Sequence, residues 1–416
     1  MYKKETLKNG LRIVTEHLPH VKSAALGFWV KCGSRYEPST MQGISHFIEH
    51  MLFKGTLTRS ARDIAEELES VGGVLNAFTG REYSCFYARV LSEHIDLALD
   101  ILCDMLQNSI FSEDEIQKEK NVVIEEIKMY EDTPDESIHD LFTEVVWNNH
   151  PLGKPILGSY DTINNFSRKG IVNYFKDNYI PENIVLSISG NIDHDRIIKK
   201  VENMFVNNDG KRTQINSDCP EFNGAFVYKS KELEQTHFCL GVEGLSQMDQ
   251  DIYTLMILNN ILGGGASSRL FQKIREELGL AYSVYSYQSI YKDKGLFTIY
   301  AGTSPKLAPQ VVKEIIKEIT NLQKHGITAA EVERAKAQLK GNLYLSMEST
   351  SNRMSRLGRT ELYFDRVVTV EEVVNNFQKV KAEEVQELAQ KLLTRDKLAF
   401  TAYGPAQYKF DVTEIL

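Results

Sequence analysis

An internal repeat constrains the fold of this 416-residue chain more than any other feature of its sequence. Three pairs of matching positions occur in the same order: residues 66–68 with 276–278, 112–120 with 328–336, and Gly190 with Gly404. Their spacings are 210, 216 and 214 positions. One such match between amphipathic helices arises easily by chance, but three in order favour a duplication. We therefore predict an α+β fold with two homologous domains, each an antiparallel sheet packed with helices.

The boundary between the two domains is predicted at a polar, turn-rich segment. A chain of this length usually forms about two domains. Residues 207–220 combine Asn, Asp, Gly, Ser and Pro with few apolar side chains, a composition typical of a loop. We expect a first domain at 1–206, a linker at 207–220 and a second domain at 221–416.

Composition and charge exclude several classes of protein. The formal net charge of −9 argues against nucleic acid as the main partner. No segment approaches the roughly 18 apolar residues that a membrane helix needs, so we expect no membrane insertion. The five cysteines are scattered and form no C-x-x-C pair, which favours reduced thiols. The N-terminus also lacks the apolar core of a signal peptide, and we expect a cytoplasmic location.

The segment at residues 43–55 contains the only H-x-x-E-H motif of the chain, formed by His46, Glu49 and His50. At about 100° per residue, a helix places the two histidines roughly 40° apart, so both imidazoles can reach one ion. Glu49 lies about 60° to the other side of His46, close enough to contact a water molecule on that ion. Two histidines, a carboxylate and an open position are typical of catalytic zinc. The ordinary alternative is a helix with two hydrogen-bonded histidines, but burying these groups among apolar neighbours would be costly.

The helical pattern at 113–131 offers a third ligand. Its apolar stripe consists of Ile116, Val123, Ile127 and Tyr130. On the same helical wheel Glu119 and Glu126 lie on one flank of the stripe, two turns apart, whereas Glu125 points to solvent. One of the two flanking carboxylates would bind the metal, and the other would orient a histidine or a water molecule. Helical phase alone leaves the order of Glu119 and Glu126 open.

The repeat places the metal-binding side chains in the first domain only. The equivalent positions of the second half carry Met256, Asn259, Asn260, Ala335 and Asn342. A zinc site is built from His, Cys, Asp and Glu, so the second domain must serve another purpose.

The chain resembles the M16 metallopeptidases, specifically the branch of mitochondrial processing peptidase and its bacterial relatives. The resemblance covers nearly the full length and rests on residues 33–37, 46–50 with 53–56, 72–77, Glu119, Glu126, 179–183, 262–265, and Arg275 to Tyr282. H-x-x-E-H is the motif of the inverzincins. The resemblance implies a clam-shell arrangement, in which two half-shells enclose an unfolded peptide.

The resemblance also implies which carboxylate binds the metal. In the family, the third zinc ligand lies about 75 residues beyond the second histidine, and here 75 residues separate His50 from Glu126. Glu119 matches the family's supporting carboxylate. The zinc ligands implied are therefore His46, His50 and Glu126.

Further roles follow from the resemblance alone. Asn76 and Ala77 match the edge strand to which substrate adds by backbone pairing. Arg275 and Tyr282 match the pair that contacts substrate and the transition-state oxyanion, although their local pattern alone reads as a surface charge and a core aromatic. Residues 263–265 match the family's glycine-rich loop near substrate.

The leading hypothesis is a zinc-dependent endopeptidase or oligopeptidase that cleaves extended peptides, with one Zn²⁺ per chain and a water molecule activated by Glu49. The alternatives are a non-catalytic core-type structural subunit and a peptide-binding module without turnover. Because one chain carries both the zinc motif and the Arg275–Tyr282 pair, a homodimer is expected rather than an obligate heterodimer.

Overall fold

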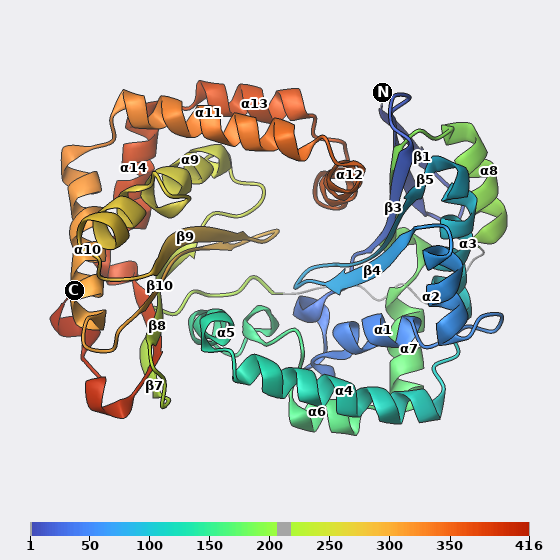
Figure 1. Cartoon of the computed structure of the whole chain (residues 1–416), viewed down its shortest axis with the longest axis horizontal. Coiled ribbons are helices and arrows are strands. Elements are labelled where there is room, and N and C mark those ends of the chain that lie inside the picture. Colours follow the sequence, from blue (N-terminus) through green and yellow to red (C-terminus); the bar gives the residue numbers. More distant parts are fainter. Residues whose placement is uncertain (1, 206–217, 416) are drawn as a thin grey trace. The chain divides into compact units, whose positions relative to one another are not determined.

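The structure, a computed structural model, describes residues 2–205 and 218–415 (Figure 1). Most of the predicted linker at 207–220 lies outside the described residues. The chain forms two compact units. Unit 1 consists of Met1–Lys128, Lys154–Ser217 and Leu345–Val368, and unit 2 of Met129–Gly153, Asp218–Tyr344 and Thr369–Leu416. Each unit therefore draws on both halves of the sequence.

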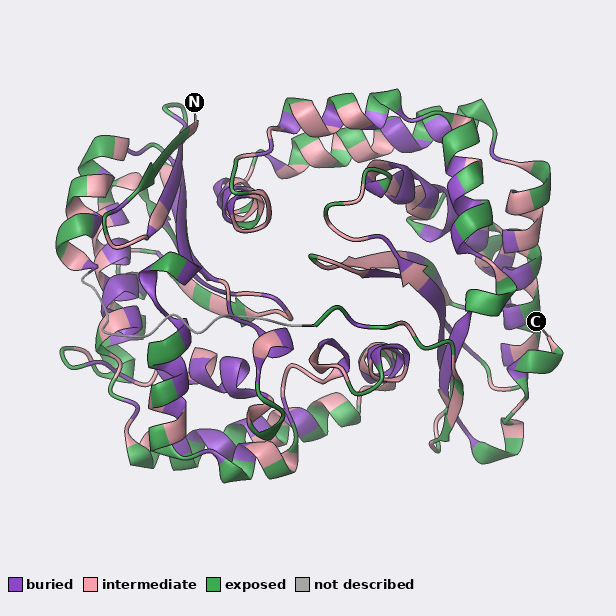
Figure 2. Cartoon of the chain, turned by 180° about the vertical axis from the view of Figure 1, so that it is seen from behind, coloured by how far each residue is buried: buried purple, intermediate pink, exposed green. Residues whose placement is uncertain are grey.

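Unit 1 is built around a six-stranded sheet with the order β1-β2-β6-β3-β5-β4. The strands are β1 (Tyr2–Thr6), β2 (Arg12–His17), β3 (Ser23–Val30), β4 (Val74–Thr79), β5 (Ser84–Leu91) and β6 (Ile184–Gly190). The apolar strand β3 is buried along nearly its whole length (Figure 2). β6 is buried at every position, as expected for strands covered on both faces. β4 pairs with β5 and forms one edge of the sheet.

Helices cover both faces of this sheet. The helices on one face are α1 (Ile44–Leu52), α2 (Ala61–Glu69), α3 (Ile95–Asn108), α4 (Glu113–Glu131), α6 (Tyr160–Asn165), α7 (Arg168–Asn178) and α8 (His194–Met204), and their apolar side chains share one core with the strands. The other face is covered by α12 (Thr350–Phe364), which packs Met354 and Leu357 into a cluster with Trp29 of β3. The Trp29 indole N–H donates to the Ser187 hydroxyl (2.8 Å), so this buried donor is satisfied.

Unit 2 repeats this plan with a five-stranded sheet in the order β7-β11-β8-β10-β9. The strands are β7 (Phe226–Ser230), β8 (Thr236–Gly244), β9 (Ser283–Ile290), β10 (Gly295–Thr303) and β11 (Ala399–Gly404). One face packs against α9 (Ile252–Gly263), the π-helix Phe271–Glu277, α10 (Ala308–His325), α11 (Ala329–Ser346), α13 (Val370–Lys379) and α14 (Ala382–Leu392). The opposite face is covered by α5 (Pro134–Trp147).

Two helices are exchanged between the halves of the sequence. α5 belongs to the first half but packs on the sheet of unit 2, and α12 belongs to the second half but packs on the sheet of unit 1. They begin 216 positions apart, at Pro134 and Thr350, so they are equivalent elements of the repeat. The predicted α+β fold with two homologous halves is confirmed. The domain limits at 1–206 and 221–416 stay a prediction about the duplicated sequence.

Each sheet is mixed, whereas wholly antiparallel sheets were predicted. β2 pairs in parallel with β6, and β7 with β11, while the other neighbours are antiparallel. Both parallel pairs join strands that are separated by long helical stretches, which provide the crossover that parallel pairing requires. Among the described residues, no helix combines the length and the apolar character that a membrane span would need.

Candidate metal centre

Helix α1 carries the H-x-x-E-H motif, and a buried carboxylate holds its N-terminus. Glu37 accepts hydrogen bonds from the backbone N–H groups of Gly43 (2.7 Å) and Ser45 (2.8 Å), two of the amides that a helix start leaves unpaired. Gly43 has a positive φ of 90°, and a Cβ there would lie 2.7 Å from the carbonyl oxygen of Leu157. Burial raises the pKa of Glu37 to about 7. The start of α1, at Ile44, is thus fixed two residues before His46.

The side chains of His46, His50 and Glu126 converge on one point. His46 Nε2 lies 3.2 Å from His50 Nε2. Glu126 Oε2 lies 3.7 Å from His46 Nε2 and 3.6 Å from His50 Nε2. Ligands bound at about 2.0–2.1 Å to a tetrahedral zinc ion are about 3.4 Å apart. The three donor atoms therefore fit one zinc ion, and no other described residues bring three His, Cys, Asp or Glu ligand atoms as close together.

His46 has the protonation state that a metal ligand needs. Burial, together with the charge on His50, lowers the pKa of His46 to about 3. The ring is therefore neutral at pH 7, and a neutral imidazole is the form that binds a metal. Among the described residues its Nδ1 has no hydrogen-bond partner, whereas its Nε2 faces His50 and Glu126.

Glu119 supports the centre from behind His50. Its Oε1 lies 2.8 Å from His50 Nδ1, and its Oε2 lies 2.7 Å from Lys54 Nζ. Burial acts to raise the pKa of Glu119, but the hydrogen bonds from His50 and Lys54 outweigh it and hold the pKa below its usual value. An ionised Glu119 accepts the Nδ1–H of His50, which leaves the lone pair of Nε2 of that ring available to a metal ion.

Glu49 lies beside the three converging side chains. Its Oε2 accepts a hydrogen bond from the Thr79 hydroxyl (2.5 Å), at the end of β4. Burial raises the pKa of the Glu49 carboxyl, although the Thr79 bond and the nearby His50 act in the opposite direction. A carboxylate with a raised pKa is a stronger base near neutral pH.

A pocket of about 290 Å³ opens beside these side chains. It is lined by Glu49, His50, Phe53, Lys54, Asn76 and Glu119. Asn76 and the half-buried Ala77 belong to β4. The expected metal-binding residues and the edge strand of the sheet thus meet within unit 1.

Arg275 and Tyr282 lie in unit 2 and contact each other. Arg275 stands on the π-helix Phe271–Glu277, a rare geometry that is frequent at functional sites. Its guanidinium carbon lies 4.4 Å from the centre of the Tyr282 ring and 4.8 Å from that of Phe271. It also donates to the Tyr282 carbonyl oxygen (2.9 Å). Tyr282 is 77% exposed, so it is not the core aromatic that its local pattern suggests.

The packing of α9 explains why at least one of the residues 263–265 is glycine. Gly263 ends α9 next to β9, and a Cβ there would lie 2.3 Å from the backbone nitrogen of Ser286. Close packing of the helix on the strand therefore requires glycine at this position.

No role was assigned from the sequence to three residues that support these side chains: Glu37, which holds the start of α1, and Lys54 and Thr79, which contact Glu119 and Glu49. Glu37 and Lys54 lie in the segments 33–37 and 53–56 that carry the family resemblance. Their place in these segments was the one indication in the sequence that they have a role. Thr79 gives no sequence signal, because its contact with Glu49 depends on where β4 lies against α1.

Two family models match most of the chain. Residues 12–159 match the model described as Insulinase (Peptidase family M16), and residues 165–339 match the Peptidase M16 inactive domain. The first range contains the H-x-x-E-H motif and Glu126, and the second contains Arg275 and Tyr282.

Similar proteins occur in several bacteria. The chain is 48% identical to a protein named as an uncharacterized zinc protease of Bacillus subtilis (strain 168), over 95% of this chain and 97% of that protein. A second uncharacterized zinc protease, from Streptomyces coelicolor, is 38% identical over 98% of this chain and 90% of its own length.

Solved structures share the fold. A protease from Helicobacter pylori has a TM-score of 0.92 at 23% identity, over 97% of this chain and 100% of that chain. A chain in the structure of complex III2 from Candida albicans has a TM-score of 0.87 at 21% identity, over 99% of this chain and 98% of its own.

Proposed function

Because this chain belongs to peptidase family M16 and is a zinc metallopeptidase, we propose that it cleaves extended or unfolded peptides internally, in the manner of a processing peptidase. The observation that carries the proposal is the convergence of His46, His50 and Glu126 at the spacing of tetrahedral zinc ligands, with Glu49 beside them. These three residues would hold one zinc ion per chain.

The residues of unit 1 have separate roles in the proposed hydrolysis. Zinc at this position would lower the pKa of a water molecule towards neutrality and polarise the scissile carbonyl. Glu49 acts as the general base, takes a proton from the attacking water and returns it to the leaving amine. The Thr79 hydroxyl engages Oε2 of Glu49, so that Oε1 is the atom that takes the proton. Glu119 keeps His50 in the tautomer with hydrogen on Nδ1.

The edge strand β4 supports an extended substrate. On the side away from β5, β4 has no partner strand among the described residues, so a peptide in extended conformation can pair with its backbone at Asn76 and Ala77. Val74 and Phe78 are exposed on the same face of the strand as Asn76. They would contact alternate side chains of the added peptide.

Arg275 and Tyr282 are assigned to substrate binding and to the oxyanion. A guanidinium and a phenol are donors suited to a negative charge that develops in the transition state. The exposure of Tyr282 leaves its ring accessible to a peptide. Because Arg275 contacts this ring, one peptide could meet both side chains together.

A structural subunit or a peptide-binding module of the same fold is the competing proposal. The likeness to a chain of complex III2 shows the fold alone. The residues expected for zinc binding and for the base are all present in this chain, and we favour the peptidase. We also propose that the protein forms a homodimer, because one chain carries both the zinc motif and the Arg275–Tyr282 pair. We propose a cytoplasmic location, because all five cysteines are free thiols, as is usual in a reducing compartment.

A library of fluorogenic peptides, assayed with and without zinc, tests the proposal. We expect cleavage that is lost with a chelator and restored by zinc. Glu49→Gln is the matched control, and it should retain zinc while turnover falls on the order of 10²-fold or more. Zinc binding without cleavage of any peptide in the library would refute the peptidase and favour a binding module.

A further inference from the structure

Lys54 follows α1 by two residues and contacts the carboxylate behind His50. Its Nζ lies 2.7 Å from Glu119 Oε2, and the side chain of Glu119 is only 3% exposed. The other oxygen of the same carboxylate, Oε1, lies 2.8 Å from His50 Nδ1. Lys54, Glu119 and His50 therefore form a chain of charge-assisted hydrogen bonds. It ends at His50 Nε2, the atom that faces His46.

The second donor gives Glu119 one fixed orientation. The terminal torsion of a glutamate is broad and nearly two-fold, because its two oxygens are equivalent. With one donor alone, the carboxylate can turn and still make its hydrogen bond. With Lys54 on one oxygen and His50 on the other, both donors are satisfied only in a single plane. Lys54 therefore controls an orientation that His50 cannot fix by itself.

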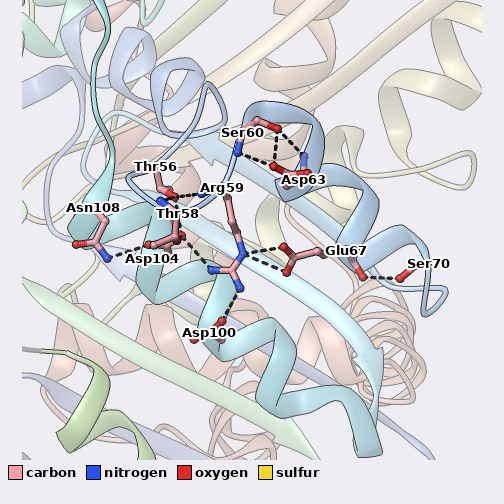
Figure 3. Close-up of polar contacts among 10 residues, drawn as sticks. All are labelled: Thr56, Thr58, Arg59, Ser60, Asp63, Glu67, Ser70, Asp100, Asp104 and Asn108. Atoms are coloured by element: carbon pink, nitrogen blue, oxygen red, sulfur yellow. Dashed lines mark hydrogen bonds and ion pairs between the residues drawn. The ribbon is translucent and has the colours of Figure 1, made fainter.

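The segment that carries Lys54 is anchored independently of the metal centre. The Thr56 hydroxyl donates to Asp104 of α3 (2.6 Å) and accepts the backbone N–H of Arg59 (2.9 Å). The Arg59 guanidinium donates to Asp104 (3.0 Å), to Asp100 (2.5 Å) and to both carboxylate oxygens of Glu67 in α2 (3.1 Å each). Figure 3 shows these carboxylates converging on Arg59. The backbone at Lys54 is thus tied to two helices.

We propose that Lys54 is a positioning residue of the metal centre. It holds the Glu119 carboxylate in the plane that keeps hydrogen on His50 Nδ1 and directs His50 Nε2 at the metal. The inference rests on the proposed zinc site, and Lys54 acts there through Glu119, not as a ligand.

The direction in which zinc affinity changes on removal of Lys54 distinguishes a positioning role from a purely electrostatic one. Lys54 is a cation near a site for a cation, so its removal would tighten zinc binding if charge alone mattered. Positioning predicts the opposite result, because a carboxylate that can turn no longer fixes His50. Loss of such outer partners typically weakens metal binding about 10–100-fold.

Zinc affinity, measured by competition with a chromophoric chelator, tests the proposal without reference to cleavage. Lys54→Met should raise the zinc Kd about 10-fold or more and change the visible spectrum of the cobalt-substituted protein. Lys54→Arg keeps a cationic donor and should restore most of the affinity. Lys118→Met is the matched control, because Lys118 forms an exposed lysine–glutamate pair on α4 with Glu115 (2.6 Å); it should behave as the wild type.

Unchanged or tighter zinc binding by Lys54→Met, with an unchanged cobalt spectrum, would overturn the proposal. Should this variant fail to unfold cooperatively, Lys54→Ala replaces it under the same criteria. A wild-type protein that binds no zinc would contradict the proposed function itself. A zinc-binding wild type with an indifferent Lys54→Met contradicts only the role of Lys54.

Discussion

Two neighbouring glutamates of α4 have different surroundings. Glu126 directs Oε2 at both histidines and is 33% exposed, whereas Glu125 is 71% exposed and pairs with Lys128. We predict that Glu126→Gln weakens zinc binding roughly 10-fold or more, because a neutral amide replaces an anionic ligand. Glu125→Gln should keep the wild-type zinc content. Metal analysis after dialysis measures both, and equal loss in the two variants would contradict the assignment.

Glu37 is a residue whose burial makes stability depend on pH. Burial raises its pKa from 4.5 to about 7. Between these values the folded protein holds a proton that the unfolded chain has released, so the free energy of unfolding falls as pH rises through this window. We predict that Glu37→Gln removes this part of the pH dependence. Urea unfolding of the metal-free protein at about pH 5 and about pH 7.5 tests this prediction. If the free energy of unfolding fell equally between these pH values in the variant and the wild type, Glu37 would be excluded as the cause.

Arg275 should matter for turnover and not for metal binding. It lies in unit 2, whose described residues contain no group of three metal-ligand side chains. Arg275→Ala should therefore retain zinc and lose most of its turnover, roughly 10²-fold, as for removal of an oxyanion donor. Lys273→Ala is the control on the same π-helix, because Lys273 forms an ion pair with Glu277 of that helix (2.7 Å). Unchanged turnover in Arg275→Ala would remove this residue from the site.

At the scale of elements, the contact of α12 with β3 depends on one glycine. A Cβ at Gly358 would lie 2.2–2.4 Å from the Trp29 ring, so Gly358→Ala should destabilise the protein by about 1–3 kcal/mol. Gly341 of α11 is the control, since a Cβ there meets nothing within 4 Å. Gly341→Ala should stabilise by about 0.4–1 kcal/mol. Urea unfolding midpoints compare the two; equal effects would argue against the tight α12–β3 contact.

Local pattern predicted the helices of the metal centre but not the contacts between elements. The sequence places the H-x-x-E-H motif of segment 43–55 on one helix and residues 113–131 on another, and α1 and α4 lie in those segments. Helical phase could not rank Glu119 and Glu126, because both lie on one flank of the helix. Nor could it find Lys54 or Thr79, whose contacts with Glu119 and Glu49 join elements that are distant in sequence.

The parallel pairing of β2 with β6, and the exchange of α5 and α12, escaped prediction for the same reason. Both depend on how the chain returns to a sheet after a long helical stretch. The repeat itself predicted that the two halves share a plan, because its spacing is visible in the sequence. It carried no information about which half supplies the helix for each sheet.

At the scale of the whole molecule, the duplication has kept its framework and changed its chemistry. Arg59 and Arg269 are 210 positions apart, and each binds carboxylates from neighbouring elements of its own unit. The second half carries Met256 and Asn260 where the first carries His46 and His50. Arginine clusters that fix helices are therefore present in both halves, whereas the side chains that we propose as metal ligands stand in one.

The exchange of helices predicts that the two halves do not fold separately. Residues 1–206 lack α12, so the apolar side chains of Trp29 and Val185 would lose their cover. We predict that this fragment, expressed alone, aggregates or binds a hydrophobic dye strongly. Co-expression with residues 221–416 should restore soluble protein. A soluble, cooperatively unfolding 1–206 fragment would contradict the prediction.

Because α12 lies far behind β6 in the sequence, the ribosome synthesises it well after the strands that it covers. The last strand of the first sheet ends at Gly190, but the helix that covers its second face ends at Phe364. At about 5–20 residues per second, roughly 9–35 s pass on the ribosome between the two. During that interval the nascent sheet presents an uncovered apolar face. We expect chaperones that bind nascent chains to recognise this face. The H-x-x-E-H helix, which ends at Leu52, is synthesised long before α12 covers the sheet.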